Sequence, residues 1–460
     1  MADRLSAVDS AFLDAETGDT PSLTIGGCLI MEGPPPDLAE IREFVLSRRP
    51  LVPKLFQRLK RSTIDGVNRA TWVDDEPDLE YHIQCDEIGD DPRGLNGAVA
   101  KLMERQLDRE RPLWEATVFT DLPESGQWAV VWRVHHSIAD GQGLSLLLGH
   151  FSDLSPEGGL TFTDAVVTAA VGRQHEVEAQ SRDKSDHPTN ALSALVHGVS
   201  DSLTTLRDVV TRVPDTAHSL LDFSPRLPSE LSGGLTDGRS WVAVEGSLAA
   251  AKAIGHKVDG TANDAILAAV AQGLAAVLQA RGSDTAGKSV RCLMPVSMRD
   301  PQDPGANNQV SILPIKLPVD IDDPRRLIAA VHKTTAVGKH SYSAQLLDAF
   351  AGLASVLVPN RVEQAAMTIG GELLGFLGDV IVTNVPGPQM PLYFMGRREL
   401  ADYPILPVGA TLRFGVAIVS FAGKVEITIT GDDQSWDEVE LLATTVRDRL
   451  DQWADELAGA

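Results

Sequence analysis

The chain has 460 residues, 43% of them hydrophobic, and a formal net charge of -24. At this length we expect two domains of about 200 residues each, because a single hydrophobic core rarely serves so long a chain. Nucleic acid is not an expected partner, since binding a polyphosphate backbone requires a basic surface. The same acidity argues against electrostatic docking on anionic lipid, so any membrane contact would be apolar or local.

Cysteine usage and the lack of an export signal indicate the compartment. Cys28, Cys85 and Cys292 lie far apart without metal-ligand spacing, which indicates a reducing environment without disulfides. The opening MADRLSAVDS is too polar for a signal peptide, and no apolar run reaches the roughly 20 residues that span a bilayer. We therefore expect a cytoplasmic protein, and peripheral contact with the inner membrane or lipid droplets stays open.

The first elements are a strand over 22–32 and a helix that begins at Asp37, after the proline run 34–36. A basic cluster follows in this acidic chain, formed by Lys54, Arg58, Lys60 and Arg61. Two interpretations are open, a solvated edge or a contact surface for the phosphates of coenzyme A.

A helix is predicted over 96–106 and a strand over 115–119. Between them stands Pro112-Leu113-Trp114, in which proline offers rigidity and tryptophan offers a large apolar area. On residue type alone, this step indicates packing rather than catalysis.

The most informative stretch runs from Ala129 to Leu148. Ala129–Val134 is a short apolar run typical of a buried strand, and an apolar, helix-like segment begins at Leu144. Two adjacent histidines, an aspartate and a glycine lie on the loop between them, where a rigid frame can present reactive groups: His135, His136, Asp140 and Gly141.

Three chemistries can be weighed for this loop. Zinc is disfavoured, because adjacent histidines in extended chain point to opposite faces and no second Cys/His cluster is present; we expect no metal and no cofactor. A Ser-His-Asp hydrolase is disfavoured because the Gly-x-Ser-x-Gly turn is absent. A lone histidine base remains, since imidazole can take a proton from a hydroxyl and return it to a leaving group near neutral pH.

The composition changes between residues 165 and 238. Residues 174–189 are polar and predict a linker, whereas apolar residues recur at steps of three and four over 192–213. We interpret the latter as a crossover helix packed against one domain. The alternative, an interfacial helix on a lipid surface, is disfavoured by aspartates and few lysines on its polar face.

The second half mixes strands and helices again. A strand is predicted over 240–244, and Thr261 is the expected N-cap of an apolar helix over 262–281. Asn263 and Asp264 occupy the first turn of this helix, where capping and a functional role are both open. Strand patterns also occur at 290–295, 308–318, 379–384 and 415–430, and helical patterns at 324–339, 345–369 and 437–457.

The motif His135-His136-x3-Asp140-Gly141 resembles the active-site motif of chloramphenicol acetyltransferase-like enzymes. Within that superfamily, further landmarks resemble the bacterial wax ester synthase/diacylglycerol acyltransferase family of the triacylglycerol synthase type. These are the opening LSAVDSAF, Arg111-Pro112-Leu113-Trp114-Glu115, Asn263-Asp264 and Thr383-Asn384-Val385-Pro386-Gly387-Pro388. The resemblance implies an α/β (α+β sandwich) fold, in which two acetyltransferase-like domains enclose a substrate channel. We expect an N-terminal domain over 1–164, a linker and crossover helix over 165–238 and a C-terminal domain over 239–460.

The resemblance also implies an O-acyltransferase that moves a fatty acyl group from acyl-CoA to diacylglycerol or to a long-chain alcohol. His136 would be the general base, His135 would orient the loop and Gly141 would permit its bend. Asp140 would pin the loop through an arginine, for which Arg299 is the candidate. Asn263, Asp264 and Asn384 would support the site, and Pro112, Leu113 and Trp114 would shape the channel.

Two alternatives remain at this level. One is a condensation-type or polyketide-linked acyltransferase that uses a carrier-protein thioester, which would share the His-His motif but not the other landmarks. The other is a non-catalytic lipid-binding protein, which the intact motif disfavours.

Overall fold

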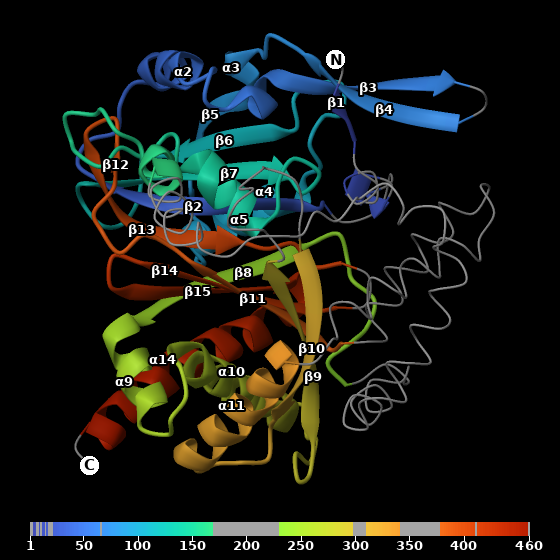
Figure 1. Ribbon diagram of the computed structural model, residues 1–460, viewed down its shortest axis with the longest axis vertical. Coiled ribbons are helices and arrows are strands. Elements are labelled where there is room, and N and C mark those ends of the chain that lie inside the picture. The colour runs from blue at the N-terminus through green and yellow to red at the C-terminus, as the bar shows by residue number, and fades with distance from the viewer. Residues whose placement is uncertain are drawn as a thin grey trace, which may run out of the picture.

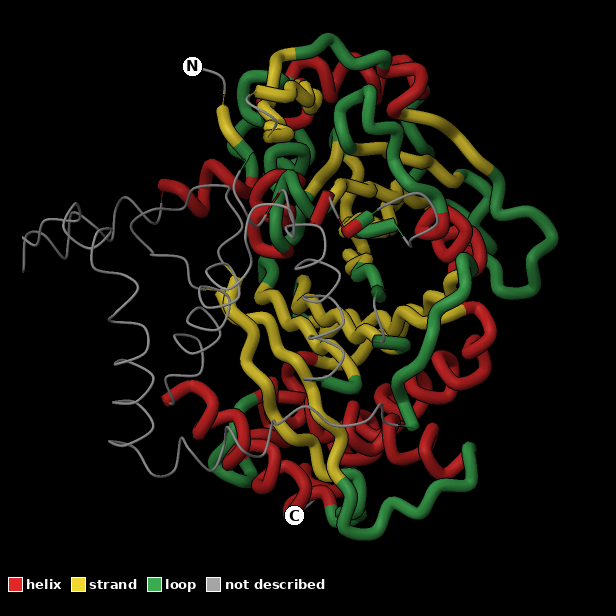
Figure 2. The backbone as a smooth tube through the Cα atoms, turned by 90° about the vertical axis from the view of Figure 1, so that its right-hand side faces the viewer, coloured by secondary structure: helices red, strands yellow, loops and turns green. Residues whose placement is uncertain are grey.

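The computed structural model describes residues 3–5, 9, 12–13, 15–16, 22–64, 67–168, 230–297, 310–340, 378–409 and 412–458. Within them, two six-stranded sheets lie one above the other (Figure 1). A view turned by a quarter shows the same two layers of strands, with helices gathered beyond the C-terminal sheet (Figure 2). The helices predicted over 192–213 and 345–369 lie outside the described residues.

The N-terminal sheet has the strand order β12-β13-β2-β7-β6-β5. Its strands are β2 (Thr24–Glu32), β5 (Ile83–Asp86), β6 (Trp114–Phe119), β7 (Gln127–His135), β12 (Tyr393–Phe394) and β13 (Arg397–Ile405). The named helices among the described residues of this half are η1 (Pro53–Phe56), α2 (Leu38–Ser47), α3 (Leu79–His82), α4 (Leu95–Glu104) and α5 (Gly141–Leu148). A separate small sheet has the order β1-β4-β3, from β1 (Asp3–Arg4), β3 (Gln57–Ile64) and β4 (Val67–Asp74).

The C-terminal sheet has the order β10-β9-β11-β14-β15-β8. Its strands are β8 (Arg239–Ser247), β9 (Ser289–Ser297), β10 (Val310–Pro318), β11 (Val380–Pro386), β14 (Phe414–Phe421) and β15 (Lys424–Asp432). Four helices cover one face of it: α9 (Leu248–His256), α10 (Ala262–Ala280), α11 (Pro324–His340) and α14 (Trp436–Ala458). Of the described helices, α10 alone is long and apolar enough to cross a membrane, but most of it is buried in this core.

Strand β13 joins the two halves, because it comes from the C-terminal part of the chain but belongs to the N-terminal sheet. It pairs antiparallel with β2, with Tyr403 opposite Cys28 and Ile405 opposite Gly26. The range 239–460 therefore completes the sheet begun by the range 1–164. The boundaries at 164 and 238 stay predictions.

The central strands of the N-terminal sheet are apolar on both faces, and the two faces enter different cores. On β7, Ala129 and Val131 pack in the core shared with the C-terminal half, whereas Val130 and Trp132 pack in the core of the N-terminal half. Because successive strand residues point to opposite faces, a strand covered on both sides carries apolar residues in succession; the exception here is Arg133, which is buried and paired with Glu115 at 2.5 Å. The strand predicted over Ala129–Val134 is confirmed for this reason.

Three carboxylates lie between the two sheets: Glu399 on β13 and Glu426 on β15 are buried, and Asp402 on β13 is partly exposed. The Asp402 N–H donates to Oε2 of Glu426 at 2.6 Å, which links the sheets directly. Burial and the neighbouring Asp402 carboxylate raise the pKa of Glu426 to about 9, and burial raises the pKa of Asp402 to about 6. Protons are therefore retained in this interface at neutral pH.

We expect the stability of the protein to fall with rising pH because of Glu426. The carboxyl ionises near its ordinary pKa of 4.5 in the unfolded chain but only near 9 in the folded one. Between those values the unfolded chain binds fewer protons, so raising the pH favours unfolding. Glu426→Gln keeps an acceptor for Asp402 and should have an increasingly higher Tm than the wild type toward alkaline pH.

The measurement is Tm for both proteins at several values between about pH 6 and pH 9. Glu32→Gln, an exposed position on β2, is the matched control and should leave the pH dependence unchanged. Parallel curves of Tm against pH for wild type and Glu426→Gln would show that Glu426 is not the source of the pH dependence.

Candidate active site

The His-His loop connects β7 to α5, as the sequence predicts. β7 is paired on one side with β2 and on the other with β6, so its end is fixed from both directions. His135 is the last residue of the strand, and Asp140 is the N-cap of α5. His136 follows the strand directly and begins the loop.

The backbone of the two histidines is held by flanking segments. The His135 N–H donates to the carbonyl oxygen of Leu113 at 3.0 Å, and the His136 N–H donates to that of Leu23 at 3.2 Å. Leu113 belongs to the Pro-Leu-Trp step and Leu23 immediately precedes β2. Two segments that are distant in sequence therefore fix the backbone position of the two histidines at the end of β7.

His135 is buried, and its hydrogen bonds define its tautomer. Its Nδ1 lies 3.1 Å from the backbone nitrogen of Ser137, which can only donate, so Nδ1 accepts and carries no proton. The neutral ring must then carry its proton on Nε2, which lies 3.5 Å from Oε2 of Glu16. His135 therefore has neighbours on both sides of its ring, and its role in orienting the loop stays a prediction.

His136 is partly exposed, and one face of its ring is covered. Phe12 stacks on it with ring centroids 4.1 Å apart and an angle of 10° between the planes. Burial, assisted by the neighbouring His135, lowers the pKa of His136 to about 4, against the raising influence of the Asp140 and Asp9 carboxylates. At neutral pH the imidazole is uncharged, as a general base must be.

Asp140 is buried and caps α5. Its Oδ1 accepts the N–H of Gly143 at 2.8 Å, which satisfies one of the free donors of the first turn. The predicted partner Arg299 lies outside the described residues, so the pairing stays a prediction.

Gly141 is the first residue of α5, and its φ is not in the left-handed region. The backbone of Gly141 is therefore helical and does not show the bend for which a glycine was expected. A Cβ at this position would lie 3.5 Å from Cγ2 of Val385, at the end of β11. The Asn-Val-Pro-Gly-Pro segment of the C-terminal half thus approaches the catalytic loop of the N-terminal half.

The supporting residues of the C-terminal half divide into two roles. Nδ2 of Asn384 donates to Oδ1 of Asn263 at 2.8 Å, so the two asparagines predicted to support the site are in contact. Asp264 instead forms a capping box with Thr261 and accepts from the Thr335 hydroxyl at 2.7 Å. For Asp264 the structure therefore supports capping, together with attachment of α11.

Trp114 lies fully buried in a stack of aromatic rings. It stacks on His82 at 4.6 Å and on Trp132 at 5.8 Å, and its Nε1 donates to the carbonyl of Leu55 at 2.7 Å. Pro112 and Leu113 are buried as well. The Pro-Leu-Trp step thus holds the His-His loop through the hydrogen bond from His135 to the Leu113 carbonyl. Its predicted role in shaping the substrate channel stays a prediction.

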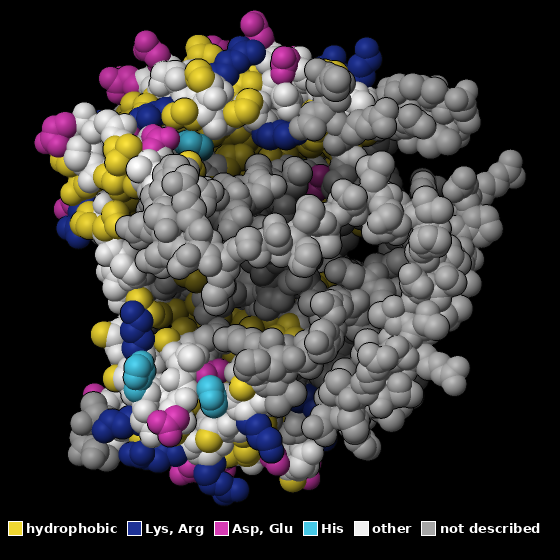
Figure 3. Space-filling view, in the orientation of Figure 1, with side chains coloured by type: hydrophobic (Ala, Val, Ile, Leu, Met, Phe, Trp, Pro, Cys, Tyr) yellow, Lys and Arg dark blue, Asp and Glu magenta, His cyan; other side chains and the backbone are white. Residues whose placement is uncertain are grey.

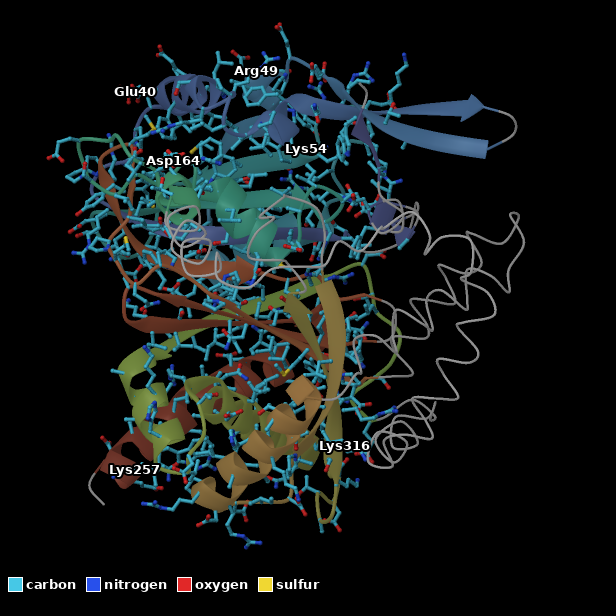
Figure 4. All side chains as sticks on the ribbon, in the orientation of Figure 1. Glu40, Arg49, Lys54, Asp164, Lys257 and Lys316 are labelled. Carbon is cyan, nitrogen blue, oxygen red and sulfur yellow. The ribbon has the colours of Figure 1, made fainter. Side chains whose placement is uncertain are left out.

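The basic cluster lies at the start of the β3–β4 hairpin, where Figure 4 labels Lys54. Lys54 sits over the Trp72 ring at 4.9 Å, and Nε of Arg58 lies 3.7 Å from an oxygen of Asp75. The side chain of Arg61 is outside the described part. Both interpretations of the cluster, a solvated edge and a phosphate contact, remain open.

Glu16 and Ser137, which both contact His135, and Phe12, which stacks on His136, have no role among the sequence-based predictions. Phe12 stood in the opening stretch that carried the family resemblance, and its four-residue spacing from Glu16 was the available signal. Among the described residues, no group of three His, Cys, Asp or Glu could hold a metal ion.

The fold belongs to a known class. The chain matches the solved wax ester synthase/diacylglycerol acyltransferase of Marinobacter aquaeolei with a TM-score of 0.67 at 20% identity, over 100% of both chains. It matches the first condensation domain of the CDA synthetase with a TM-score of 0.60 at 16% identity, over 99% of this chain and 96% of the other. The expected two-domain α/β fold is confirmed.

Sequence comparison defines the family. The wax ester synthase/diacylglycerol acyltransferase catalytic domain matches residues 5–266, and the C-terminal domain of the same family matches residues 306–453. A protein named probable diacylglycerol O-acyltransferase from Mycobacterium tuberculosis is 30% identical over 454 residues, 97% of this chain and 94% of that protein. The chain belongs to the wax ester synthase/diacylglycerol acyltransferase family and is an acyltransferase. The carrier-protein and non-catalytic alternatives are not favoured.

We predict that the acid limb of the pH–rate profile lies well below the ordinary imidazole value of 6.5, because the pKa of His136 is lowered to about 4. The base is active when neutral, so the rate should be lost only as the pH falls through the lowered value. The stability of the fold should also fall as the pH falls, because between pH 6.5 and about 4 the unfolded chain binds a proton at His136 that the folded chain does not bind.

The measurement is kcat/KM, which reports the free enzyme, between about pH 3.5 and pH 9, with Tm recorded at each value. An acid limb centred above 7 would mean that another group controls the reaction.

Proposed function

We propose that this enzyme transfers a fatty acyl group from acyl-CoA to diacylglycerol, forming triacylglycerol, with His136 as general base. A fatty alcohol would be a second acceptor, giving a wax ester. The observation that carries the proposal is a neutral imidazole at the His-His loop, held where the C-terminal half approaches the N-terminal half.

The proposed reaction needs one base and no covalent acyl-enzyme. His136 removes the hydroxyl proton of the acceptor as its oxygen attacks the thioester carbonyl carbon. The tetrahedral intermediate then expels the coenzyme A thiolate, which takes the proton back from His136. The new C–O bond replaces the C–S bond, and the base returns to its starting form.

The carboxylates near His136 fit this cycle. Asp140 and Asp9 both act to raise the pKa of His136 against the effect of burial, which means that they stabilise its protonated form. That form exists only during the reaction, so this interaction favours the transition state over the ground state.

The substrates are apolar chains with a charged or polar end. In the space-filling view, hydrophobic side chains gather near the border between the two halves (Figure 3). We propose that the acyl chain and the acceptor lie along this border and that Lys54, Arg58 and Lys60 contact the phosphates of coenzyme A. No cofactor enters the scheme, since a thioester is already activated.

We further propose that the enzyme is cytoplasmic and touches the inner membrane or lipid droplets peripherally, because diacylglycerol resides in lipid phases. Fractionation of cells that express a tagged chain would test this. Recovery only in the soluble fraction at every stage of lipid accumulation would reject the membrane contact.

We predict that His136→Ala lowers turnover by about 100- to 10,000-fold, the usual effect of removing a general base. His135→Ala should be milder, since that ring orients the loop. Release of free coenzyme A from long-chain acyl-CoA, with diacylglycerol and a fatty alcohol as parallel acceptors, measures both variants and ranks the acceptors. Wild-type turnover in His136→Ala would reject the mechanism, and a larger loss in His135→Ala would reverse the two roles.

Asp140→Asn should lower both activity and Tm, because the predicted pair with Arg299 loses its charge. Asparagine caps helices about as well as aspartate, so the cap at Gly143 is kept and the loss reports the carboxylate charge. Breaking a buried pair costs about 3–5 kcal/mol. Differential scanning calorimetry checks the stability, with Asp140→Ala as the variant that also loses the cap. An unchanged Tm in Asp140→Asn would argue against the pair.

A further inference from the structure

One helical turn before β2 faces both histidines. The Glu16 N–H lies 3.3 Å from the carbonyl oxygen of Phe12, and residues four apart on such a turn share one face. On that face, Phe12 stacks on His136, while the Glu16 carboxylate approaches His135. The spacing of the pair Phe12 and Glu16 therefore matches the neighbouring histidines.

The Glu16 carboxylate is buried and has specific neighbours. Its Oε2 accepts the N–H of Leu23 at 2.6 Å and lies 3.5 Å from Nε2 of His135. Its Oε1 lies 3.7 Å from Arg109, which also donates to the Glu16 main-chain carbonyl. Burial opposes the charge, but the contacts to His135, Leu23 and Arg109 prevail and lower the pKa of Glu16.

These contacts reach both histidines through short paths. Toward His135 the path is direct, because the Ser137 amide occupies Nδ1 and the other ring nitrogen, Nε2, lies 3.5 Å from Oε2 of Glu16. Toward His136 it passes through Leu23, which donates its N–H to Glu16 and accepts the N–H of His136 on its carbonyl. One side chain thus lies against the ring of one histidine and holds the segment that accepts the backbone N–H of the other.

We propose that Glu16 is a positioning residue for acyl transfer, acting through His135 and Leu23 to hold the His136 base in place. This rests on the proposed role of His136. What the reaction needs from Glu16 is a correctly placed acceptor oxygen, since Oε2 alone serves both Leu23 and His135. The negative charge is secondary to the reach of the side chain.

If the acceptor oxygen matters more than the charge, the kcat values of three Glu16 variants should follow a fixed order. Glu16→Ala removes the acceptor and should lower kcat by about 10- to 100-fold, as a misplacement of the order of 1 Å does. Glu16→Gln keeps an oxygen at the same reach and should stay within about fivefold of wild type. Glu16→Asp keeps the charge but shortens the side chain, so it should fall below Glu16→Gln. KM for acyl-CoA should change by less than about threefold in all three.

Glu32→Gln is the matched control, because Glu32 is an exposed glutamate on the neighbouring strand β2. Tm is measured for every variant so that losses of kcat are compared only among folded proteins. If Glu16→Ala does not fold, the comparison of Glu16→Asp with Glu16→Gln still decides. Wild-type kcat in Glu16→Ala, or a kcat in Glu16→Asp equal to or above that in Glu16→Gln, would overturn the proposal.

A spectroscopic reading separates this proposal from the proposed function. In protein labelled with 15N-histidine, the ring signals of His135 are assigned by their loss in His135→Asn. The Ser137 amide keeps the proton on Nε2 in every variant, so we expect the Nε2 signal to shift in Glu16→Ala, which loses the nearby oxygen, and to shift less in Glu16→Gln. This result does not depend on any substrate. A wild type inactive with acyl-CoA and diacylglycerol would refute the proposed function, whereas an Nε2 signal unchanged in Glu16→Ala would refute the role of Glu16.

Discussion

The active site depends on keeping an imidazole uncharged at a position that is largely removed from water. Burial disfavours the charged form of a histidine, and here that effect exceeds the attraction of the nearby carboxylates. A base made weak in this way is available at every physiological pH, but it must be placed accurately to act on a hydroxyl. The rest of the site can be understood as the means of placement: a strand fixed on both sides, two carbonyls that hold the backbone, and an aromatic ring against the imidazole face.

Placement requires contributions from distant parts of the chain. Leu23 and Phe12 come from the first residues, Leu113 from the segment before β6, and Val385 from the C-terminal half. The segments share few covalent constraints, and what keeps them together is the pairing of β13 with β2 and the common core between the sheets. Glu399 and Asp402 of β13 belong to the same interface, and burial there raises the pKa of both carboxyls.

Much of the fold could be predicted from local patterns, and the exceptions have physical reasons. The apolar run Ala129–Val134 and the glycines after it placed the His-His loop correctly, because a strand, a turn and a helix each have short-range signals. Strand β13 was missed because its sequence RRELADYPI is rich in charged residues, which suggest an exposed segment, although Glu399 among them is buried. Within the site, Asp264 looked equally suited to capping and function, and only its contacts with Thr261 and Thr335 distinguish the two. Glu16 could not be assigned, since its role depends on Leu23 and His135 meeting it in space.

The strand order also constrains how the chain can be made. During synthesis from the N-terminus, β2 and β7 can pair early, but the other edge of β2 has no partner until β13 has left the ribosome. An unpaired, apolar strand edge is a template for association with other chains, so the nascent protein carries this hazard through most of its translation. Slow translation of the last part of the mRNA would prolong the time for which the edge of β2 is unpaired. Circular permutation that brings residues 397–405 ahead of β2 would shorten it, by turning the longest-range pairing of the sheet into a local one.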